Sequence, residues 1–259
     1  MTKAVHVDEA LVIGQSSEQH RPVLLVPALE GYQRWAPTYD HVPNPLLALE
    51  ERYLLPRLTG LSNKSVLDLG CGTGRWLLKL GQSVSGVGID CSKSMLQVAG
   101  IKSAIRGRLV QAACDSLPLI NAAFELAVCS FALGHIRTLD PVVRELRRVM
   151  KLDGDVFVSD LHPEAYERGW RVGFRDGATA VQIETQPRSA EQIIDAFSSN
   201  GFDCQAQHSL RLGEPEEPLF ARAGKSGSFS AACRLPAVLL CHFRRTAEPW
   251  DERPNESCN

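Results

Sequence analysis

Short apolar runs alternate with stretches of helical apolar spacing between Lys64 and about Asp160. The runs are rich in Val, Ile and Leu, and we expect strands at SVLDLG, SVSGVGID, RLVQAA, FELAVCSFAL and GDVFVSDL. Apolar residues recur at helical spacing in GRWLLKLGQ, SKSMLQVAGIKS and DPVVRELRRVMK, the last with Asp140 as its expected cap. Strands that alternate with helices are typical of repeated βαβ units around a mostly parallel sheet.

The pattern changes on both sides of this stretch. Residues 45–58 have helical spacing, and the aromatic, proline-broken segment 31–40 suits a cover over a site. After the fifth strand, an Asp-Gly pair at 176–177 predicts an inserted hairpin, and Ser189 is placed to cap a helix. Further expected elements are closing strands at 202–212 and 235–245, a polar loop at 213–229, and an N-terminal hairpin of 4–13 with 21–26.

The sequence VLDLGCGTGRW, at residues 66–76, breaks an apolar run into three glycines at alternate positions. Glycine permits unusual dihedrals and lets a ligand approach the main chain where a strand turns into a helix. Dinucleotide-binding turns read G-x-G-x-x-G and face a pyrophosphate, whereas here Arg75 takes the sixth place and Asp68 precedes the glycines. Because a carboxylate is a poor neighbour for phosphate, the turn favours a cationic ligand.

The motif DLGCGTG, followed by GIDCSKSML, resembles the class I S-adenosylmethionine-dependent methyltransferases. The similarity is to the small-molecule, type 11-like group that includes the ubiquinone and menaquinone biosynthesis methyltransferases. It covers about Tyr32 to Asp160, and the remainder only in architecture. The resemblance implies S-adenosyl-L-methionine as cofactor and an enzyme that transfers its methyl group to a small-molecule acceptor by in-line displacement.

We therefore expect an α/β fold with a Rossmann-like, doubly wound, mostly parallel seven-stranded sheet and an antiparallel last strand. An N-terminal cover and a hairpin insertion after the fifth strand complete it. The chain is expected to form a single domain, 1–259. Its parts are a cover and helix at 1–60, a cofactor-binding core at 61–160, a substrate-side insertion with closing strands at 161–248, and a tail at 249–259.

The resemblance implies a set of cofactor-binding residues. The glycines would lie beneath the methionine part, with Asp68 near its amino end, and Asp90 would accept both ribose hydroxyls. At the adenine motif the chain departs from the family, since Ala113 stands where an Asp is common; either Asp115 or the Cys114 backbone would hold adenine there. The full set is Tyr32, Tyr39, Asp68, Gly70, Cys71, Gly72, Thr73, Gly74, Asp90, Cys91, Met95, Cys114, Asp115 and Ser130.

Candidate catalytic groups are sought at the ends of the fourth and fifth strands. His135, in the loop SFALGHIRTLD, is the first candidate for a general base, and the alternative is a loop histidine that ties down a backbone carbonyl. His162, after the fifth strand, is expected to face the same pocket. The acceptor wall is expected from the inserted aromatic residues Trp170, Phe174 and Phe220.

Composition limits the partners. The net charge of -2, with Lys and Arg scattered among acids, argues against nucleic acid. The eight cysteines form no C-x-x-C pair, so we expect reduced thiols and no metal site. No segment approaches the roughly 20 apolar residues of a membrane span, and the N-terminus lacks the layout of a signal peptide. A cytoplasmic monomer or homodimer without membrane contacts is expected.

Three alternatives stay open on the sequence. The chain could bind S-adenosylmethionine or S-adenosylhomocysteine without catalysis, methylate RNA or protein, or use a nicotinamide cofactor as an oxidoreductase. The acceptor atom is open among O, N, C and S.

Overall fold

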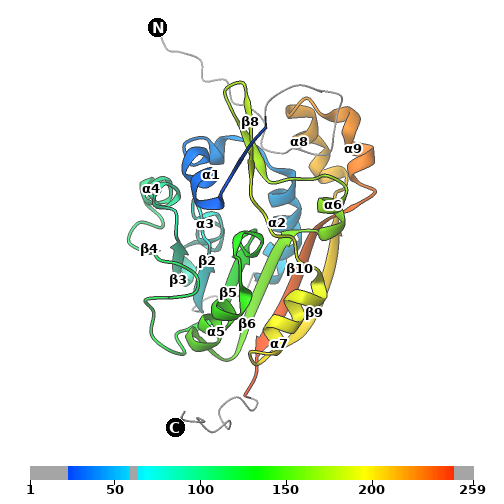
Figure 1. Ribbon diagram of the computed structural model, residues 1–259. Helices are drawn as coiled ribbons and strands as arrows, with labels where there is room; N and C mark the ends of the chain where they lie inside the picture. Colours follow the sequence, from blue (N-terminus) through cyan, green and yellow to red (C-terminus); the bar gives the residue numbers. More distant parts are fainter. Residues whose placement is uncertain (1–22, 59–63, 248–259) are drawn as a thin grey trace, which may run out of the picture.

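The computed structural model describes residues 23–58 and 64–247, and within them seven strands form one sheet in the order β4-β3-β2-β5-β6-β10-β9 (Figure 1). Strands β4 to β6 are parallel, whereas β10 is antiparallel to both its neighbours, β6 and β9. This confirms the predicted sheet with its antiparallel last strand. The bounds are β2 Ser65–Leu69, β3 Ser85–Asp90, β4 Leu109–Gln111, β5 Phe124–Ser130, β6 Met150–Leu161, β9 Phe202–Arg211 and β10 Pro236–Arg245.

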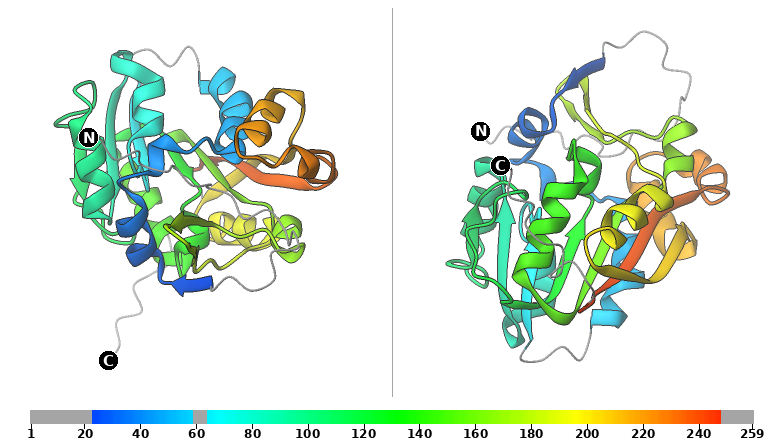
Figure 2. Two further views of the ribbon diagram at one scale, coloured as in Figure 1. Left: turned by 90° about the horizontal axis from the view of Figure 1, so that it is seen from above. Right: turned by 60° about the horizontal axis from the view of Figure 1, so that its bottom comes forward.

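Helices cover both faces of the sheet (Figure 2). Alternate residues of β5 enter different apolar clusters: Ala127 packs with α5 and α7, and Val128 packs with α2 and α3. Two covered faces explain why the strands are almost continuously apolar. The helices of these layers are α2 Pro45–Leu58, α3 Arg75–Leu80, α4 Lys93–Ile101, α5 Leu139–Val149 and α7 Ala190–Ser198, with 3-10 turns η1 Tyr39–His41, η2 Gly81–Ser83 and η3 Leu133–His135.

Helix starts follow side-chain chemistry where a cap is available. Ser189 and Gln192 form the predicted reciprocal capping box of α7. The predicted cap of α5 is wrong: the helix begins at Leu139, which is buried, so Asp140 lies inside the first turn. The Asp140 carboxylate instead pairs with Arg144 and accepts a hydrogen bond from Asn200 Nδ2 at 2.9 Å.

A second, three-stranded sheet lies over the carboxyl ends of the main strands. Strands β7 Gly173–Asp176 and β8 Thr179–Ile183 form a hairpin, and β1 Val23–Val26 adds to β8 in parallel. Residues 4–13, expected to pair with 21–26, lie outside the described residues; Val23–Val26 pairs with β8. Helix α1 Ala28–Trp35 packs against this sheet.

The segment expected to be a polar loop at 213–229 is helical, with η4 Glu214–Glu216, α8 Glu217–Arg222 and α9 Ser226–Ala232. It is anchored by buried groups: Glu216 accepts two hydrogen bonds from Arg52 of α2, at 2.9 and 3.1 Å, and Phe220 is 1% exposed. Helix α6 Pro163–Glu167 follows β6. None of the helices within the described residues is long and apolar enough to cross a bilayer.

Candidate active site

A cavity lies at the carboxyl ends of β2, β3 and β5, where the strand order reverses. It contains about 880 Å³ of empty space, part of it open to solvent. The α1 and η1 cover closes one side of it. Its lining residues are Ala28, Leu29, Tyr32, Tyr39, Gly70, Gly72, Asp90, Cys91, Ser92, Met95, Cys114, Ser130, Phe131, Ala132, His135 and Ile136.

The glycine turn gives this cavity a main-chain floor. Gly70 and Gly72 have φ angles of +73° and +53°, which disfavour residues with a side chain. A Cβ at Gly70 would lie 2.6 Å from the Ala132 Cβ, so Gly70 is required for packing. A Cβ at Gly72 would meet nothing within 4 Å, because that position faces open space. The Gly72 backbone is therefore free to meet a ligand closely.

Asp90 is held rigidly at the end of β3. Its Oδ2 accepts the Gly72 N–H at 2.8 Å, and its Oδ1 accepts the Ser92 N–H at 2.7 Å. Burial raises the pKa of the Asp90 carboxyl, and these two N–H groups act in the opposite direction. Each oxygen keeps a lone pair that can accept from one hydroxyl of a vicinal diol.

Asp68 lies behind the turn, away from the cavity lining. It is 1% exposed, and its Oδ2 has no hydrogen-bond partner among the described residues. Burial raises the pKa of Asp68 to about 7, although the Arg75 charge and the Leu77 N–H both lower it. An unsatisfied buried carboxylate beside the turn favours a cationic group and opposes a phosphate. The site therefore fits an aminoacyl sulfonium ligand better than a dinucleotide.

A buried ionic network joins this turn to α2. Arg75 donates to Glu50, which is fully buried, and to Ser130 Oγ at 2.8 Å. Glu50 also accepts from Ser159 Oγ. No sequence motif marks Glu50, so its role was missed; the signal available was an acid on an otherwise apolar helix face.

A second link connects the cover to the turn. Thr73 Oγ1 donates to Asp40 at 2.6 Å, and Lys102 Nζ lies 2.6 Å from the other Asp40 oxygen. Lys102 also donates to the Thr73 carbonyl at 2.7 Å. The Thr73 side chain is thus committed to η1, and it does not line the cavity.

His135 meets Tyr32 on the cavity wall. His135 Nδ1 lies 3.0 Å from the Glu184 carbonyl oxygen, which can only accept, so Nδ1 carries the proton of the neutral ring. His135 Nε2 then accepts from Tyr32 Oη at 2.9 Å. Burial raises the pKa of Tyr32 well above its usual value, so Tyr32 stays protonated at neutral pH.

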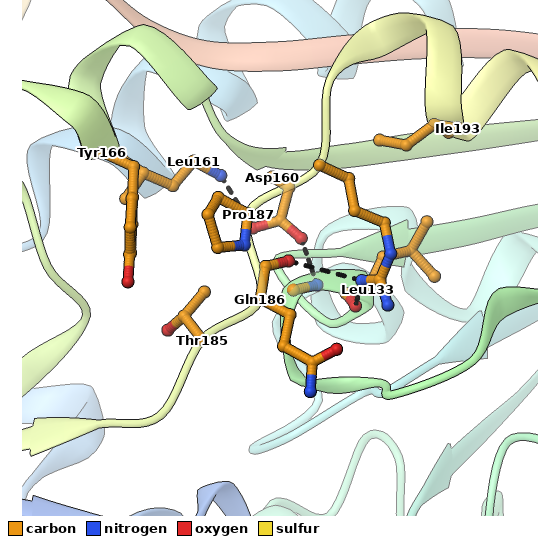
Figure 3. Close-up of a pocket in the computed structure, with 10 residues that line it drawn as sticks. Leu133, Asp160, Leu161, Tyr166, Thr185, Gln186, Pro187 and Ile193 are labelled. Carbon is orange, nitrogen blue, oxygen red and sulfur yellow. Dashed lines mark hydrogen bonds between the residues drawn. The ribbon is translucent and has the colours of Figure 1, made fainter.

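The loop that carries His135 is held in place by Asp160 and Arg188, and Figure 3 shows Asp160 beside Leu133 of this loop. Asp160, at the end of β6, accepts the Gly134 N–H at 2.5 Å and the Leu161 N–H at 2.8 Å. Arg188 donates to the Leu133 carbonyl at 2.7 Å. Burial raises the pKa of Asp160, and the neighbouring His135 lowers it.

The comparisons with known proteins agree with this geometry. A family described as "Methyltransferase domain" matches residues 66–154. The uncharacterised methyltransferase AN0656 of Emericella nidulans is 30% identical over an alignment of 244 positions, gaps included, that covers 76% of this chain and 84% of that protein. The chain belongs to the S-adenosylmethionine-dependent methyltransferases.

Other members of the family are also similar. The demethylmenaquinone methyltransferase of Lactococcus lactis is 29% identical over an alignment of 162 positions, gaps included, that covers 55% of this chain and 64% of that protein. The structure of a putative S-adenosylmethionine-dependent methyltransferase from Listeria monocytogenes has a TM-score of 0.59 at 20% identity and covers 77% of this chain and 99% of that one. The cofactor of this methyltransferase is S-adenosylmethionine, and the fold and family predictions are confirmed.

The methyltransferase brings most of the predicted site residues together, but not all. His162 was expected to face the cavity; instead its Nδ1 accepts the Glu164 N–H at 3.2 Å and its Nε2 contacts Ser209 Oγ at 3.0 Å, so it caps α6 away from the cavity. Asp115 is exposed and outside the lining, whereas Cys114 lines it. The Cys71 side chain lies against Gly88, behind the turn.

The three aromatic residues predicted to form the acceptor wall do not line one common cavity in the methyltransferase. Phe220 packs against Phe229, with ring centroids 5.3 Å apart, in the cluster beneath α8, which is not part of the cavity lining. Phe174 is stacked on Trp35 at 5.1 Å. Of these three residues, Trp170 lines a second cavity, which lies next to the cofactor cavity. Within residues 23–58 and 64–247, no group of three or more His, Cys, Asp or Glu side chains is arranged to hold a metal ion.

Proposed function

We propose that this methyltransferase transfers the methyl group of S-adenosylmethionine to a small-molecule acceptor by in-line displacement, with His135 as the general base. The observation that supports this most is the hydrogen bond between His135 Nε2 and Tyr32 Oη on the wall of the cofactor cavity. The unprotonated Nε2 of a neutral histidine can take a proton, and here it can do so through the Tyr32 hydroxyl that donates to it.

The cofactor would be held mainly by main-chain groups and one acid. Asp90 would accept the two ribose hydroxyls, and the bare backbone at Gly72 would lie against the methionine part. Asp68 would act on the amino group through water, since its side chain does not reach the cavity. Met95, Cys91 and Cys114 would enclose the adenine, with the Cys114 main chain in place of the missing acid. Tyr32, Tyr39 and Ser130 line the opposite wall.

When bound, S-adenosylmethionine supplies an electrophilic methyl group on a sulfonium. The chain's own contribution is alignment and exclusion of water, which can lower the barrier without a strong base. Tyr32 lines the cavity, and its Oη donates to His135 Nε2. A proton from the acceptor would therefore pass to the Tyr32 oxygen while the Tyr32 proton moves to Nε2.

A small acceptor is supported by the shape of the site. The α1 and η1 cover closes over the cavity, and its side chains Ala28, Leu29, Tyr32 and Tyr39 line it. The demethylmenaquinone methyltransferase that this chain resembles is itself named for a small-molecule acceptor. A polymer would need the cover to be displaced.

The test is label transfer from methyl-labelled S-adenosylmethionine into the small-molecule and macromolecular fractions of a cell extract. We expect label in the small-molecule fraction only. His135→Ala should lower turnover of the labelled acceptor by about 100-fold or more, because general-base groups contribute at least this factor. His162→Ala is the matched control and should stay within about twofold.

Label in protein or RNA would contradict the proposal. Full turnover in His135→Ala would show that His135 is not the general base. If S-adenosylhomocysteine binds but no fraction is labelled, the chain is a cofactor-binding protein without transfer activity.

A further inference from the structure

A second cavity lies next to the cofactor cavity and shares a wall with it. It contains about 520 Å³ of empty space, part of it open to solvent. Tyr32, Tyr39 and Phe131 line both cavities, so the two cavities meet at these three residues, which form the partition. The other lining residues are Trp35, Asn44, Leu46, Leu47, Leu161, Trp170, Arg171, Val172 and Gly173.

The walls of this second cavity are flat and aromatic. Trp35 stacks on Tyr32 with ring centroids 5.9 Å apart and an interplanar angle of 11°. Tyr39 meets the Trp35 ring edge-on at 4.8 Å. Trp170 is 3% exposed, so its ring is fixed by packing. Rigid aromatic faces offer apolar contact to a planar molecule at little entropic cost.

Two polar features give the cavity a preferred charge. Arg171 lines it, and no acidic residue does so among the described residues. Arg171 Nη1 donates to the Tyr166 and Trp170 carbonyls at 2.6 and 2.8 Å, and its Cζ lies 3.9 Å from the Tyr166 ring centroid. The guanidinium is thus held in place. Trp35 Nε1 is buried without a partner among the described residues, which leaves one N–H donor unsatisfied.

The partition itself is strained. Phe131 has a φ of +51°, a conformation that costs a residue with a side chain roughly 1 kcal/mol. Its N–H donates to the Ser159 carbonyl at 2.8 Å, which holds the turn in place. The other non-glycine residues with positive φ in the described part of the chain, Ala122 and Asp153, line neither cavity. Strain of this kind is concentrated at functional sites.

We propose that the second cavity is the acceptor site and that its acceptor is a planar aromatic molecule with an anionic substituent, such as a carboxylate. This inference rests on the proposed methyl-transfer function. The anionic group would face Arg171, and the rings would lie against Trp170, Leu46 and Leu161. The reacting O–H would point past Tyr32 and Phe131 toward the cofactor.

The step balances without a further reactant. The acceptor oxygen uses a lone pair to form the O–CH₃ bond as the S–CH₃ bond breaks, and the bonding pair stays on sulfur as S-adenosylhomocysteine. The hydroxyl proton leaves through Tyr32 to His135 Nε2, which is the proton acceptor of the proposed function.

The test uses a matched pair of probes, 3-hydroxy-2-naphthoate and 3-hydroxy-2-naphthamide, which differ in charge at one substituent. Each is titrated by calorimetry into the full chain saturated with S-adenosylhomocysteine. We expect the naphthoate to bind about 10- to 100-fold more tightly than the amide, as a guanidinium–carboxylate contact predicts.

Arg171→Gln should remove this preference and leave the affinity for S-adenosylhomocysteine within about twofold. Arg171→Lys should keep part of the preference, because the positive charge remains. The control is Arg168→Gln, an exposed arginine close in sequence that lines neither cavity.

The inference is overturned if neither probe binds, if the amide binds as well as the naphthoate, or if Arg171→Gln weakens both probes equally. Failure of the proposed function looks different: the label-transfer experiment would leave the small-molecule fraction of the extract unlabelled, whatever the two probes do. Normal binding of S-adenosylhomocysteine without a charge preference would therefore reject this inference alone.

Discussion

The two cavities meet at three aromatic residues but are built in different ways. The cofactor cavity stands on strand ends and on main-chain turns such as that at Gly72, each of which is set by neighbouring residues. The second cavity is lined by residues from α1, η1, the start of α2, the turn after β5, the end of β6 and residues 170–173. Geometry set by the backbone can be recognised in a motif, whereas geometry set by distant side chains cannot. The same contrast predicts different sensitivities to mutation.

The largest effect is expected at the buried Glu50–Arg75 pair, measured as a loss in the free energy of unfolding. Arg75→Met leaves Glu50 fully buried without its counter-charge, so we expect the free energy of unfolding to fall by about 3–5 kcal/mol. Arg34→Met breaks an Arg–Glu pair of which both side chains are more than 40% exposed, and should cost about 0.5 kcal/mol or less. Urea denaturation of both variants gives the comparison. Equal losses would show that the buried Glu50 does not depend on Arg75 for its counter-charge.

The cofactor region should depend on one carboxylate. Asp90→Ala removes the proposed ribose acceptor and also the partner of the Gly72 N–H, so S-adenosylhomocysteine should bind about 30- to 100-fold more weakly. Asp115→Ala is the control, since Asp115 is exposed and outside the cavity lining. Calorimetry measures both. If Asp115→Ala lowers the affinity for S-adenosylhomocysteine as much as Asp90→Ala does, then Asp115 contacts the cofactor after all.

The raised pKa of Asp68 predicts that the free energy of unfolding depends on pH. Its folded-state pKa of about 7 lies above the ordinary value, so the folded chain holds a proton that the unfolded chain has already lost. Stability from this group is therefore lost as pH rises, by about 2 kcal/mol between about pH 5.5 and pH 7.5. Asp68→Asn cannot titrate and should lack this component. Parallel stability curves for the two proteins in urea would contradict the raised pKa.

The smallest change in the free energy of unfolding is expected when the positive φ at Phe131 of the partition is relieved. Ala122→Gly relieves a positive φ at an exposed site and should raise the free energy of unfolding by roughly 1 kcal/mol. Phe131→Gly relieves the same strain but removes a ring that packs against the core, so its gain should be smaller. Thermal unfolding compares the two variants. A gain in stability in Phe131→Gly that equals or exceeds the gain in Ala122→Gly would show that the Phe131 ring does not stabilise the fold.

The sequence predicted the features that depend on local backbone chemistry. The glycine turn, Asp90 at the end of its strand and the capping box at Ser189 were all recognisable, because each is set by neighbouring residues. The N-terminal cover was also recognisable, because its aromatic and proline content breaks the surrounding pattern. The structure places Tyr32 in the cavity wall.

Features that join distant segments were missed. The Glu50–Arg75 pair and the Tyr32–His135 bond each join separate elements, and no local pattern records such pairs. His162 was misplaced because the position after a strand end does not determine where the side chain points; here it caps its own helix. The helices at 213–229 were hidden because buried contacts such as that of Glu216 override a polar composition.

The central claim is that the main chain at the glycine turn holds S-adenosylmethionine. The most direct measurement is calorimetric titration of the chain with S-adenosylhomocysteine and with NAD, repeated in Gly72→Val and in Gly107→Val. Both glycines have positive φ and open space around a Cβ, but only Gly72 lines the cavity. We predict that S-adenosylhomocysteine binds the wild type and Gly107→Val, that Gly72→Val abolishes this binding, and that NAD gives no heat. Binding of NAD alone, or full affinity for S-adenosylhomocysteine in Gly72→Val, would contradict the account.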